Sequence, residues 1–462
     1  MPIILPTWTK GRNARSPLYL WYVSPLPPHP YGSFQPESEG ESRRMQKTRR
    51  VVITGLGVVA PNGIGKDAFW DALIAGKSGV DYITAFDPST YPCHIAAEVK
   101  DFRPFDFINV RRARTMGRFS QFAVAATRMG LEDARLAITP SLSSQAAICY
   151  GTSVAGGGDI AADAMEILLN KGPESIDSWS ALEYPPHAPS SYLAIEFQIH
   201  GPAISVSSNC CTGLDAIQIA ATQIRSGQVK VAVAGACDAP IFPLAFGAFC
   251  ALGALTKRND APKKASRPYD ALRDGIVMAE GAGTLVLEEL DFALDRGAHI
   301  YAEVLGHEGA SEAVGMRKGD LSGKMLARAI SGAIRASNLI PSDIDHINAH
   351  GSSLPDYDVC DSNAFKEALG AHAYKIPVVS IKSMIGQPVS AAGAIQTVAA
   401  CLSIQHQQVP PTINQEVSDP RCDLDYVPNV TRTARIRRVL MNGHSFGGSV
   451  SALVIRRLDT LD

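Results

Sequence analysis

Four short segments place reactive or polar side chains at the ends of apolar runs. In the first, Cys210 follows the run AISVS and precedes TGLDAIQIAATQIRSG, a pattern typical of a helix. Cys210 is therefore expected at a helix N-terminus, where unpaired N–H groups and the helix dipole favour a thiolate nucleophile. A buried, inert thiol is the alternative, because most cysteines of reducing compartments are of that kind.

The other three segments have the same form. His350 lies in NAHGSS, beside a glycine that leaves room for a substrate, and Lys382 lies in SIKSMIGQ, where an apolar run ends. The fourth segment, residues 442–448, is the glycine-rich loop NGHSFGG. Each also has an ordinary interpretation. His350 could be a structural histidine, Lys382 a surface lysine, and the 442–448 segment a plain turn. No phosphate-binding glycine pattern occurs between a strand and a helix.

These segments need a scaffold of strands and helices, which the chain supplies from Val51 onward. Short, unbroken β-branched runs alternate with helical patterns, as is typical of a layered α/β protein whose sheets are covered on both faces. The expected strands are Val51–Gly55, Ala146–Tyr150, Ile204–Ser207, Val229–Gly235, Gly283–Glu288, Ile344–Ala349, Val378–Ile381 and Val439–Met441. The expected helices include Gly117–Ala137, Thr212–Ser226 and Gly323–Asn338.

Two segments of the first half recur in the second. Gly130–Ser153 matches Gly332–Ser353 as helix, Pro-Ser turn and strand, and Ala203–Gln228 matches Pro377–His406 as strand, turn and helix. Such internal similarity indicates two copies of one α/β unit. Cys210 falls in the turn of one copy, and Lys382 and Gln387 fall in the turn of the other. A duplicated fold would bring these turns together at a shared cleft.

The composition excludes several classes of protein. Of the 462 residues 19% are charged and the net charge is −2, which argues against a general nucleic-acid binder and against a wholly disordered chain. Nine cysteines include no C-x-x-C pair, so we expect a reducing compartment, no disulfide framework and no zinc or other metal site. No apolar run is long enough to cross a membrane, and a cytoplasmic protein is expected.

Residues 1–44 differ from the rest of the chain. Eight of the 30 prolines and two of the four tryptophans lie there, and proline interrupts both helices and central strands. The segment fits neither a secretory signal nor a transit peptide. It is expected to be a disordered extension, or an upstream misassigned start, before Met45.

In this order and at these spacings, the segments from Met45 to the C-terminus resemble the β-ketoacyl-acyl-carrier-protein synthases of the KAS II type, in the thiolase-like superfamily. The resemblance rests on VVITGLGVVAPNG, SRPYDALRDGIVMAEGAG, NAHGSS, SIKSMIG and VPPTINQEVSDPRCDLDYVPN. It implies an α/β fold with two duplicated halves in a five-layered αβαβα core. Residues 45–300 would form the half with the nucleophile, and residues 301–462 the half with His350, Lys382 and Gln387.

The resemblance also implies a role for each site residue. Cys210 matches the nucleophile that takes an acyl group from a carrier-protein thioester. His350 matches the histidine that assists decarboxylation of a malonyl unit, and Lys382 matches the lysine that supports this histidine. Phe446 and Gly447 match the gating loop, and the Phe446 backbone N–H would join that of Cys210 in an oxyanion hole. The expected reaction is decarboxylative Claisen condensation of an acyl-cysteine with malonyl-carrier protein in fatty-acid or polyketide synthesis.

Gln387 is the main departure from the family, which has a second catalytic histidine at this position. A carboxamide N–H can also donate to the malonyl thioester oxygen, and condensing enzymes of the III type and chalcone-synthase-like enzymes use asparagine for this. Glutamine is one methylene longer, and a donor misplaced by about 1 Å costs on the order of a hundredfold in rate.

Other departures lie in the same segments. His444 stands where a phenylalanine is usual, and it would either partly replace the missing imidazole or simply pack the loop. Cys211, Leu354 and Ser449–Val450 also differ from the family. Several changes in one pocket indicate specialised metabolism rather than bulk fatty-acid elongation.

Acyl carrier protein is the expected partner, and because it brings the phosphopantetheine arm, no cofactor of the chain's own is expected. The basic cluster Arg111, Arg112, Arg114 and Arg118 would dock it, although a solvated helix face is the plainer interpretation. We expect a homodimer, or a heterodimer with another ketosynthase-like subunit. We expect no nucleic-acid partner.

Two other functions stay open from the sequence. In the first, the chain is a weakly catalytic or chain-length-factor-like subunit of a ketosynthase heterodimer. In the second, it is an acyltransferase that uses Cys210 without decarboxylation.

Overall fold

The computed structural model describes residues 49–154 and 159–458. The expected extension at residues 1–44 lies outside the described residues. Among the described residues, no helix is long and apolar enough to cross a membrane.

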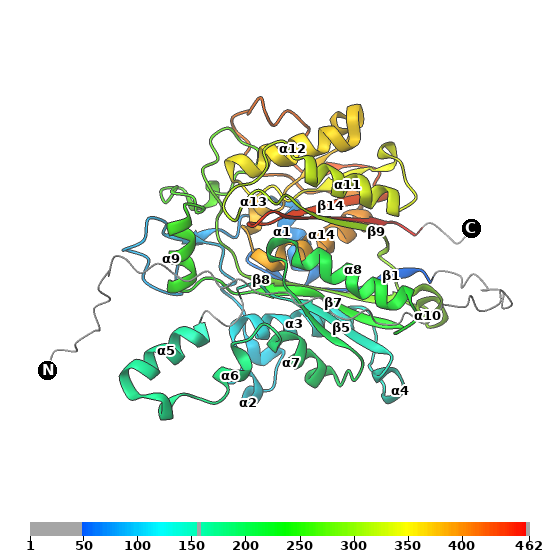
Figure 1. Ribbon diagram of the computed structural model, residues 1–462. Helices are drawn as coiled ribbons and strands as arrows, with labels where there is room; N and C mark the ends of the chain where they lie inside the picture. The colour runs from blue at the N-terminus through cyan, green and yellow to red at the C-terminus, as the bar shows by residue number, and fades with distance from the viewer. Residues whose placement is uncertain (1–48, 155–158, 459–462) are drawn as a thin grey trace, which may run out of the picture. The chain divides into compact units, whose positions relative to one another are not determined.

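The chain forms five alternating layers of helix and sheet (Figure 1). Helices α3 (Arg118–Asp133) and α7 (Ala188–Phe197) cover the outer face of one sheet, and α11 (Lys324–Ala336) and α12 (Pro355–Leu369) cover the outer face of the other. Helices α8 (Thr212–Arg225) and α14 (Ala392–His406) lie between the two sheets. The predicted five-layered αβαβα fold is confirmed.

The two sheets have the same strand order. In the first half it is β6 (Ala203–Val206), β5 (Ala146–Gly151), β7 (Val231–Asp238), β8 (Gly281–Glu289) and β1 (Val51–Ala60). In the second half it is β11 (Val378–Val379), β10 (His346–Asn348), β14 (Arg438–His444), β15 (Ser449–Arg456) and β9 (Ala302–Ser311). In each set the first three strands pair parallel to one another. The fourth strand pairs antiparallel with the third, and the fifth pairs antiparallel with the fourth. This identity of topology confirms the predicted duplication.

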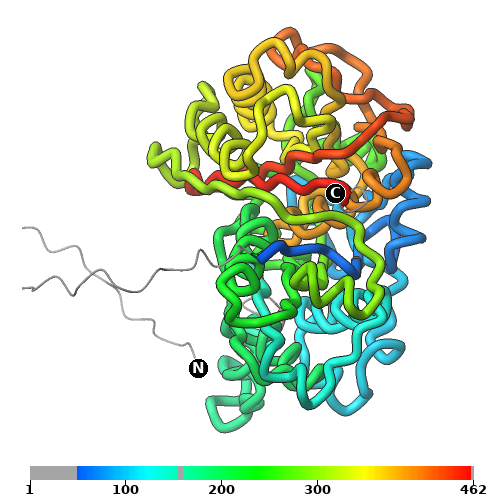
Figure 2. Tube along the Cα trace, turned by 90° about the vertical axis from the view of Figure 1, so that its right-hand side faces the viewer, coloured from blue at the N-terminus to red at the C-terminus, as the bar shows by residue number. Residues whose placement is uncertain are grey.

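One feature of the sheets was not expected from the sequence. Strands β1 and β9 pair antiparallel through Val52 with Glu303 and Ile53 with Ala302, so the two sheets form one hydrogen-bonded path. Figure 2 shows these strands side by side between the first half, coloured blue to green, and the second half, coloured yellow to red. The halves are therefore joined at a sheet edge as well as through the central helices.

The remaining elements are short connections and surface helices. The helices are α1 (Lys66–Ile74), α2 (Val110–Ala113), α4 (Pro140–Ser143), α5 (Asp159–Lys171), α6 (Ser180–Glu183), α9 (Pro243–Leu252), α10 (Leu290–Asp295) and α13 (Lys382–Ile385). The small strands are β2 (Gly63–Ile64), β3 (Asp81–Tyr82), β4 (Ile95–Ala96), β12 (Gln408–Val409) and β13 (Arg432–Thr433).

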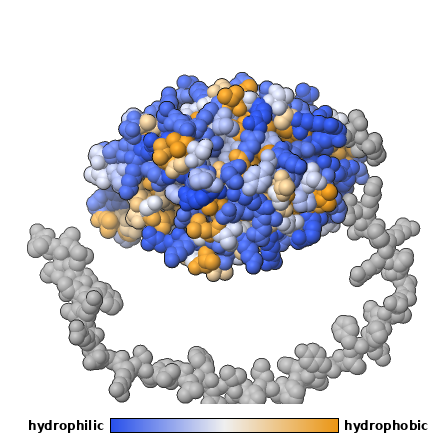
Figure 3. All heavy atoms as spheres, turned by 90° about the horizontal axis from the view of Figure 1, so that it is seen from above, coloured by the Kyte–Doolittle hydropathy of each residue, from blue (hydrophilic) through white to orange (hydrophobic). Residues whose placement is uncertain are grey.

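Apolar burial explains the layers. Every residue of β1 is buried, as expected for a strand covered on both faces. Helix α14 is buried along almost its whole length, because it packs between the sheets rather than on the surface. Seen from above, the side of the outer helices α11 and α12 is mostly hydrophilic, with apolar groups in small separate patches (Figure 3).

The central helices α8 and α14 meet through two glycines. A side chain at Gly213 would lie 2.3 Å from the backbone N of Ala394, and one at Gly393 would lie 2.7 Å from the backbone N of Leu214. No real side chain fits at these separations, so the two backbones touch directly. This contact sets the turn before α8 against the turn before α14.

Gly213→Ala is expected to lower the free energy of unfolding by about 1–3 kcal/mol, because the added methyl group forces the two helices apart. Urea unfolding measures the loss. Gly130→Ala in α3 is the matched control, since its methyl group would meet nothing nearer than 3.5 Å. The control should unfold as the parent does or gain up to about 1 kcal/mol. Equal stability of Gly213→Ala and the parent would contradict the close contact.

Candidate active site

Cys210 lies in a tight turn between β6 and α8. Residues Asn209–Cys211 form a short 3-10 turn, and α8 begins at Thr212, so the predicted position before a helix is confirmed. Asn209 has a φ of 55°, in the left-handed region that costs energy and clusters at functional turns. The Cys210 side chain is buried, and its Sγ contacts Asn209 Oδ1 at 3.5 Å.

The second half contains the same turn with different chemistry. Residues Val389–Ala391 form a 3-10 turn before α14, and Val389 has a φ of 46°, which is rare for a β-branched residue. Ser390 occupies the position that Cys210 has in the first half. Its backbone N donates to Asp238 Oδ2 at 2.9 Å and its Oγ donates to the carbonyl oxygen of Cys237 at 2.9 Å. Ser390 is thus committed to joining the halves.

Burial raises the pKa of the Cys210 thiol to about 12. The charge of Lys382 and a hydrogen bond from its own backbone lower the pKa, but the loss of water outweighs both, and Asp238 adds to the rise. The raised pKa favours the neutral thiol in the resting protein, in the opposite direction to the thiolate expected from the helix N-terminus.

Gln387 makes the direct contact between the two halves of the site. Its Nε2 donates to Cys210 Sγ at 3.4 Å, and its backbone N donates to the carbonyl oxygen of Val277 at 2.8 Å. The Oε1 atom is buried and has no hydrogen-bond partner in the described part of the chain. The side chain is only 4% exposed, so the amide faces the thiol in a pocket that water hardly reaches.

His350 follows β10 and is held by its backbone. Its N–H donates to Asn442 Oδ1 at 3.0 Å, and its carbonyl oxygen accepts from Lys382 Nζ at 2.6 Å. The ring atom Nδ1 is buried, and residues 49–154 and 159–458 offer it no hydrogen-bond partner. Burial, followed by the charges of Lys382 and His444, holds the pKa of His350 well below its usual range. The imidazole is therefore neutral.

Lys382 is the first residue of α13 and is buried. Besides the carbonyl oxygen of His350, its Nζ donates to Gln396 Oε1 at 3.3 Å. Burial lowers the pKa of Lys382 to about 8, although the charges of Cys210, Asp361 and Asp358 act in the opposite direction. Lys382 donates a hydrogen bond to the His350 carbonyl oxygen, and its charge also lowers the pKa of Cys210. The three residues therefore share one pocket.

Gln396 was not expected from the sequence, because it lies in the middle of helix α14. Its Nε2 donates to the carbonyl oxygens of Asn348, Ala349 and Asn442 at 3.0–3.3 Å. Its Oε1 accepts from Lys382. One amide thus fixes the strand end that carries His350 and the strand that leads to the 442–448 loop.

The 442–448 loop packs against the nucleophile turn through Ser445. Its Oγ accepts from the backbone N of Cys211 at 3.2 Å and donates to the carbonyl oxygen of Ser208 at 2.9 Å. Gly447 has a φ of 89°, and the half-buried ring of Phe446 contacts Phe249 and Tyr357 with centroid distances of 6.2 and 5.5 Å. Phe446 therefore lies at the edge of the pocket, where a gating residue belongs.

His444 is buried beside the pocket rather than in contact with the thiol. Its ring centroid is 6.2 Å from that of His350, and its Nε2 lies 3.0 Å from Glu312 Oε1. The Tyr357 ring packs against the His444 ring with a centroid distance of 4.2 Å and a tilt of 32°. An auxiliary role in place of the family's second histidine stays a prediction.

Tyr357 also escaped the sequence analysis, because a tyrosine inside a helical segment carries no signal of function. Its hydroxyl is buried and makes no hydrogen bond to any residue that the structure describes. Burial, and next the proximity of Cys210, raise the pKa of Tyr357, so the phenol is neutral. A pocket of about 430 Å³ lies beside Tyr357 and Phe446, and Leu354, Arg317 and Lys318 line it as well.

The basic cluster is divided by the fold. Arg112 pairs with Glu196, and Arg118 Nη2 pairs with Glu280 Oε1 at 2.6 Å while its guanidinium lies over the Phe122 ring. Arg111, within the short helix α2, and Arg114, directly after it, are exposed. Arg112 and Arg118 are thus engaged in ion pairs within the chain, although both side chains stay partly exposed, and docking by the four arginines stays a prediction.

Comparison with known proteins was made for the whole chain. The family model described as "Beta-ketoacyl synthase, N-terminal domain" matches residues 48–293, and "Beta-ketoacyl synthase, C-terminal domain" matches residues 301–416. The 3-oxoacyl-[acyl-carrier-protein] synthase 2 of Coxiella burnetii is 40% identical over 410 residues, which cover 89% of this chain and 99% of that protein.

Two solved structures are similar over 89% of this chain and 100% of their own. One is the ketosynthase/chain length factor of ishigamide, with a TM-score of 0.84 and 36% identity. The other comes from a type II polyketide acyl-carrier protein in complex with its ketosynthase bound to the hexaketide, with a TM-score of 0.81 and 37% identity.

The raised pKa of Cys210 predicts how the thiol reacts with iodoacetamide. Because the thiolate fraction rises about tenfold per pH unit below the pKa, the rate should climb from about pH 7 to pH 10 without a plateau. Peptide mass spectrometry measures the rate at Cys210. A plateau near neutral pH would contradict the burial argument.

Lys382→Met is the matched variant for this measurement. It should slow alkylation below about pH 8, because it removes the charge that lowers the pKa of Cys210. Above that pH the lysine itself becomes neutral, and the two rates should converge.

Proposed function

Because the chain belongs to the β-ketoacyl synthase family, which consists of acyltransferase-type condensing enzymes, we propose that it condenses an acyl group on Cys210 with malonyl-carrier protein in fatty-acid or polyketide synthesis. The contact of the Gln387 amide with the Cys210 thiol, beside a neutral His350, is the observation that carries the proposal. The contact supports the proposal, because a thiol nucleophile and neutral donors from Gln387 and His350 would then surround one thioester.

The first step transfers the acyl group. Cys210 Sγ attacks the carbonyl carbon of the acyl thioester, the bond from that carbon to the phosphopantetheine sulfur breaks, and the thiol proton ends on the departing sulfur. The backbone N–H groups of Cys210 and Phe446 would stabilise the negative oxygen of the intermediate. A neutral thiol suits this step, because its proton is needed by the leaving group.

The second step forms the carbon–carbon bond. The bond between the malonyl α-carbon and its carboxylate breaks, carbon dioxide leaves, and the electron pair passes to the thioester as an enolate. The enolate carbon then attacks the acyl carbon, Cys210 leaves as thiolate and takes up a proton, and the β-ketoacyl product stays on the carrier. His350 and Gln387 would donate to the enolate oxygen as its charge develops.

The amide has one advantage in a dry pocket. Burial holds His350 neutral and raises the pKa of Cys210, so a second imidazole would gain nothing from titration there. An amide N–H donates at every pH. Once Cys210 is acylated its sulfur accepts hydrogen bonds weakly, so Nε2 of Gln387 becomes available to the malonyl oxygen.

Acyl carrier protein is the proposed partner. The exposed Arg111 and Arg114 would meet its acidic surface, and the pocket beside Phe446 would admit the phosphopantetheine arm, with Arg317 and Lys318 near the phosphate. The arm arrives on the partner, so the condensation uses no resident cofactor. The related structure with a carrier protein bound supports this assignment.

The chain is proposed to act as a homodimer or as a heterodimer with another ketosynthase-like subunit. The edge strand β6 supports this, since Ala203, Ile204 and Ser205 are exposed although the strand leads directly to Cys210. Exposed strand edges are usually paired or covered. All nine cysteines are free, which supports the cytoplasm as the site of action.

The proposal predicts acylation of Cys210 followed by release of carbon dioxide. Incubation with acyl-carrier protein should add the acyl mass to Cys210, and Cys210→Ala should gain none. Adding malonyl-carrier protein should then release carbon dioxide and yield the β-ketoacyl product. No adduct would favour a scaffolding subunit, and an adduct without carbon dioxide would favour an acyltransferase.

Substitution of Gln387 tests the role of the amide. Gln387→Ala should still acylate Cys210 but should condense about 10²–10³-fold more slowly, because an oxyanion donor is lost. Gln387→His should retain or raise the rate of decarboxylation. Gln228→Ala, at an exposed position after α8, is the control and should behave as the parent. Loss of all activity in Gln387→His would show that the pocket is built around the amide.

A further inference from the structure

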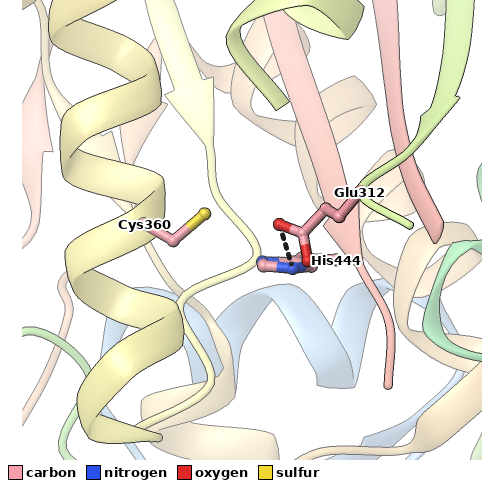
Figure 4. Close-up of side chains that lie close together, drawn as sticks. All are labelled: Glu312, Cys360 and His444. Carbon is pink, nitrogen blue, oxygen red and sulfur yellow. Dashed lines mark ion pairs between the residues drawn. The ribbon is translucent and has the colours of Figure 1, made fainter. Parts of the chain in front are cut away.

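A cluster of three metal-ligand side chains lies beside the pocket and has no part in the proposed condensation. Glu312 follows β9, Cys360 lies in α12, and His444 ends β14 (Figure 4). A carboxylate oxygen, the sulfur and an imidazole nitrogen all lie within 4.8 Å of one another, and all three side chains are buried. Because the ligands come from three distant segments, spacing along the sequence gave no sign of them.

The polar atoms of this cluster are left unsatisfied by the protein. His444 Nε2 and Glu312 Oε1 form an ion pair at 3.0 Å, yet neither atom, nor His444 Nδ1, has a hydrogen-bond partner among the described residues. Figure 4 shows the carboxylate of Glu312 off the plane of the His444 ring, with the dashed line marking their ion pair. Buried polar atoms without partners are costly and call for an ion or a water.

The cluster also has the support that ligands need. Glu312 Oε2 accepts from the backbone N of Asp320 at 3.2 Å, which fixes the carboxylate. The Tyr357 ring packs against the imidazole of His444 at a tilt of 32°. Such outer contacts orient ligands and tune metal affinity.

We propose that Glu312, Cys360 and His444 bind a zinc ion. Zinc takes cysteine sulfur, histidine nitrogen and carboxylate oxygen at about 2.0–2.3 Å, so its ligand atoms lie about 3–4 Å apart, close to the spacing here. A thiolate and a carboxylate balance the two charges of the ion, which makes the buried site neutral. Three protein ligands leave the fourth position to water.

The ion would tie the end of β9, helix α12 and the end of β14 together. His444 is two residues before Phe446, so the metal fixes one end of the loop that carries the gating ring. The role is structural, because Cys210, His350 and Gln387 supply the chemistry of condensation without it.

Metal content tests the proposal. The purified protein is incubated with zinc, dialysed against metal-free buffer and analysed by plasma mass spectrometry. One zinc ion per chain is expected in the parent, in Cys210→Ala and in Cys401→Ala, a buried thiol of α14. Cys360→Ser, Glu312→Gln and His444→Phe should fall to the background of the buffer. Background zinc in the parent, or equal zinc in all variants, would overturn the site.

Cobalt gives a second readout that does not depend on activity. Cobalt-loaded parent should show the near-ultraviolet band of a thiolate–cobalt bond, and Cys360→Ser should lose that band while keeping its fold by circular dichroism. Zinc should also raise the Tm of the parent and not that of Glu312→Gln. A parent without the band and without the shift would show that His444 and Glu312 form only an ion pair. Cys210→Ala should lose condensation but keep its zinc. Failure of the proposed condensation can therefore be distinguished from failure of the proposed zinc site.

Discussion

The direct contact of α8 and α14 through Gly213 and Gly393 is the constraint on which the site depends. Each helix begins just after a turn that carries chemistry, with Cys210 before α8 and Gln387 before α14. Because the helices touch without intervening side chains, a thiol and an amide from separate halves reach 3.4 Å. Bulkier residues at the crossing would separate the two groups beyond hydrogen-bonding distance.

Exclusion of water explains the chemical character of the pocket. Burial raises the pKa of Cys210 and lowers the pKa values of His350 and Lys382, so it disfavours the charged form of each group. The hydrogen bonds around the site are accordingly made by amides, hydroxyls and backbone groups, as Gln387, Gln396 and Ser445 illustrate. In such surroundings an uncharged donor fits a position where a histidine would also be neutral.

The sequence predicted the layers, the duplication and the position of Cys210, because strand ends followed by small polar residues have a local pattern. Strands β9 and β15 were missed, since polar residues interrupt their apolar runs. Tyr357, Gln396 and Glu312 could not be predicted, because each gains its importance from distant neighbours that only the packed chain brings near. Arg112 and Arg118 were assigned to a docking surface, and their acidic partners lie far away along the chain.

The left-handed residues Asn209 and Val389 occupy the same point of the two repeated turns. A distortion shared by both copies is most simply inherited from a single ancestral unit that paired with itself. That ancestor would have presented two equivalent turns across a symmetry axis, each able to hold a nucleophile. In the present chain one turn carries the thiol of Cys210, while the other carries the anchoring hydroxyl of Ser390. The present asymmetry would then record a division of labour between two formerly identical parts.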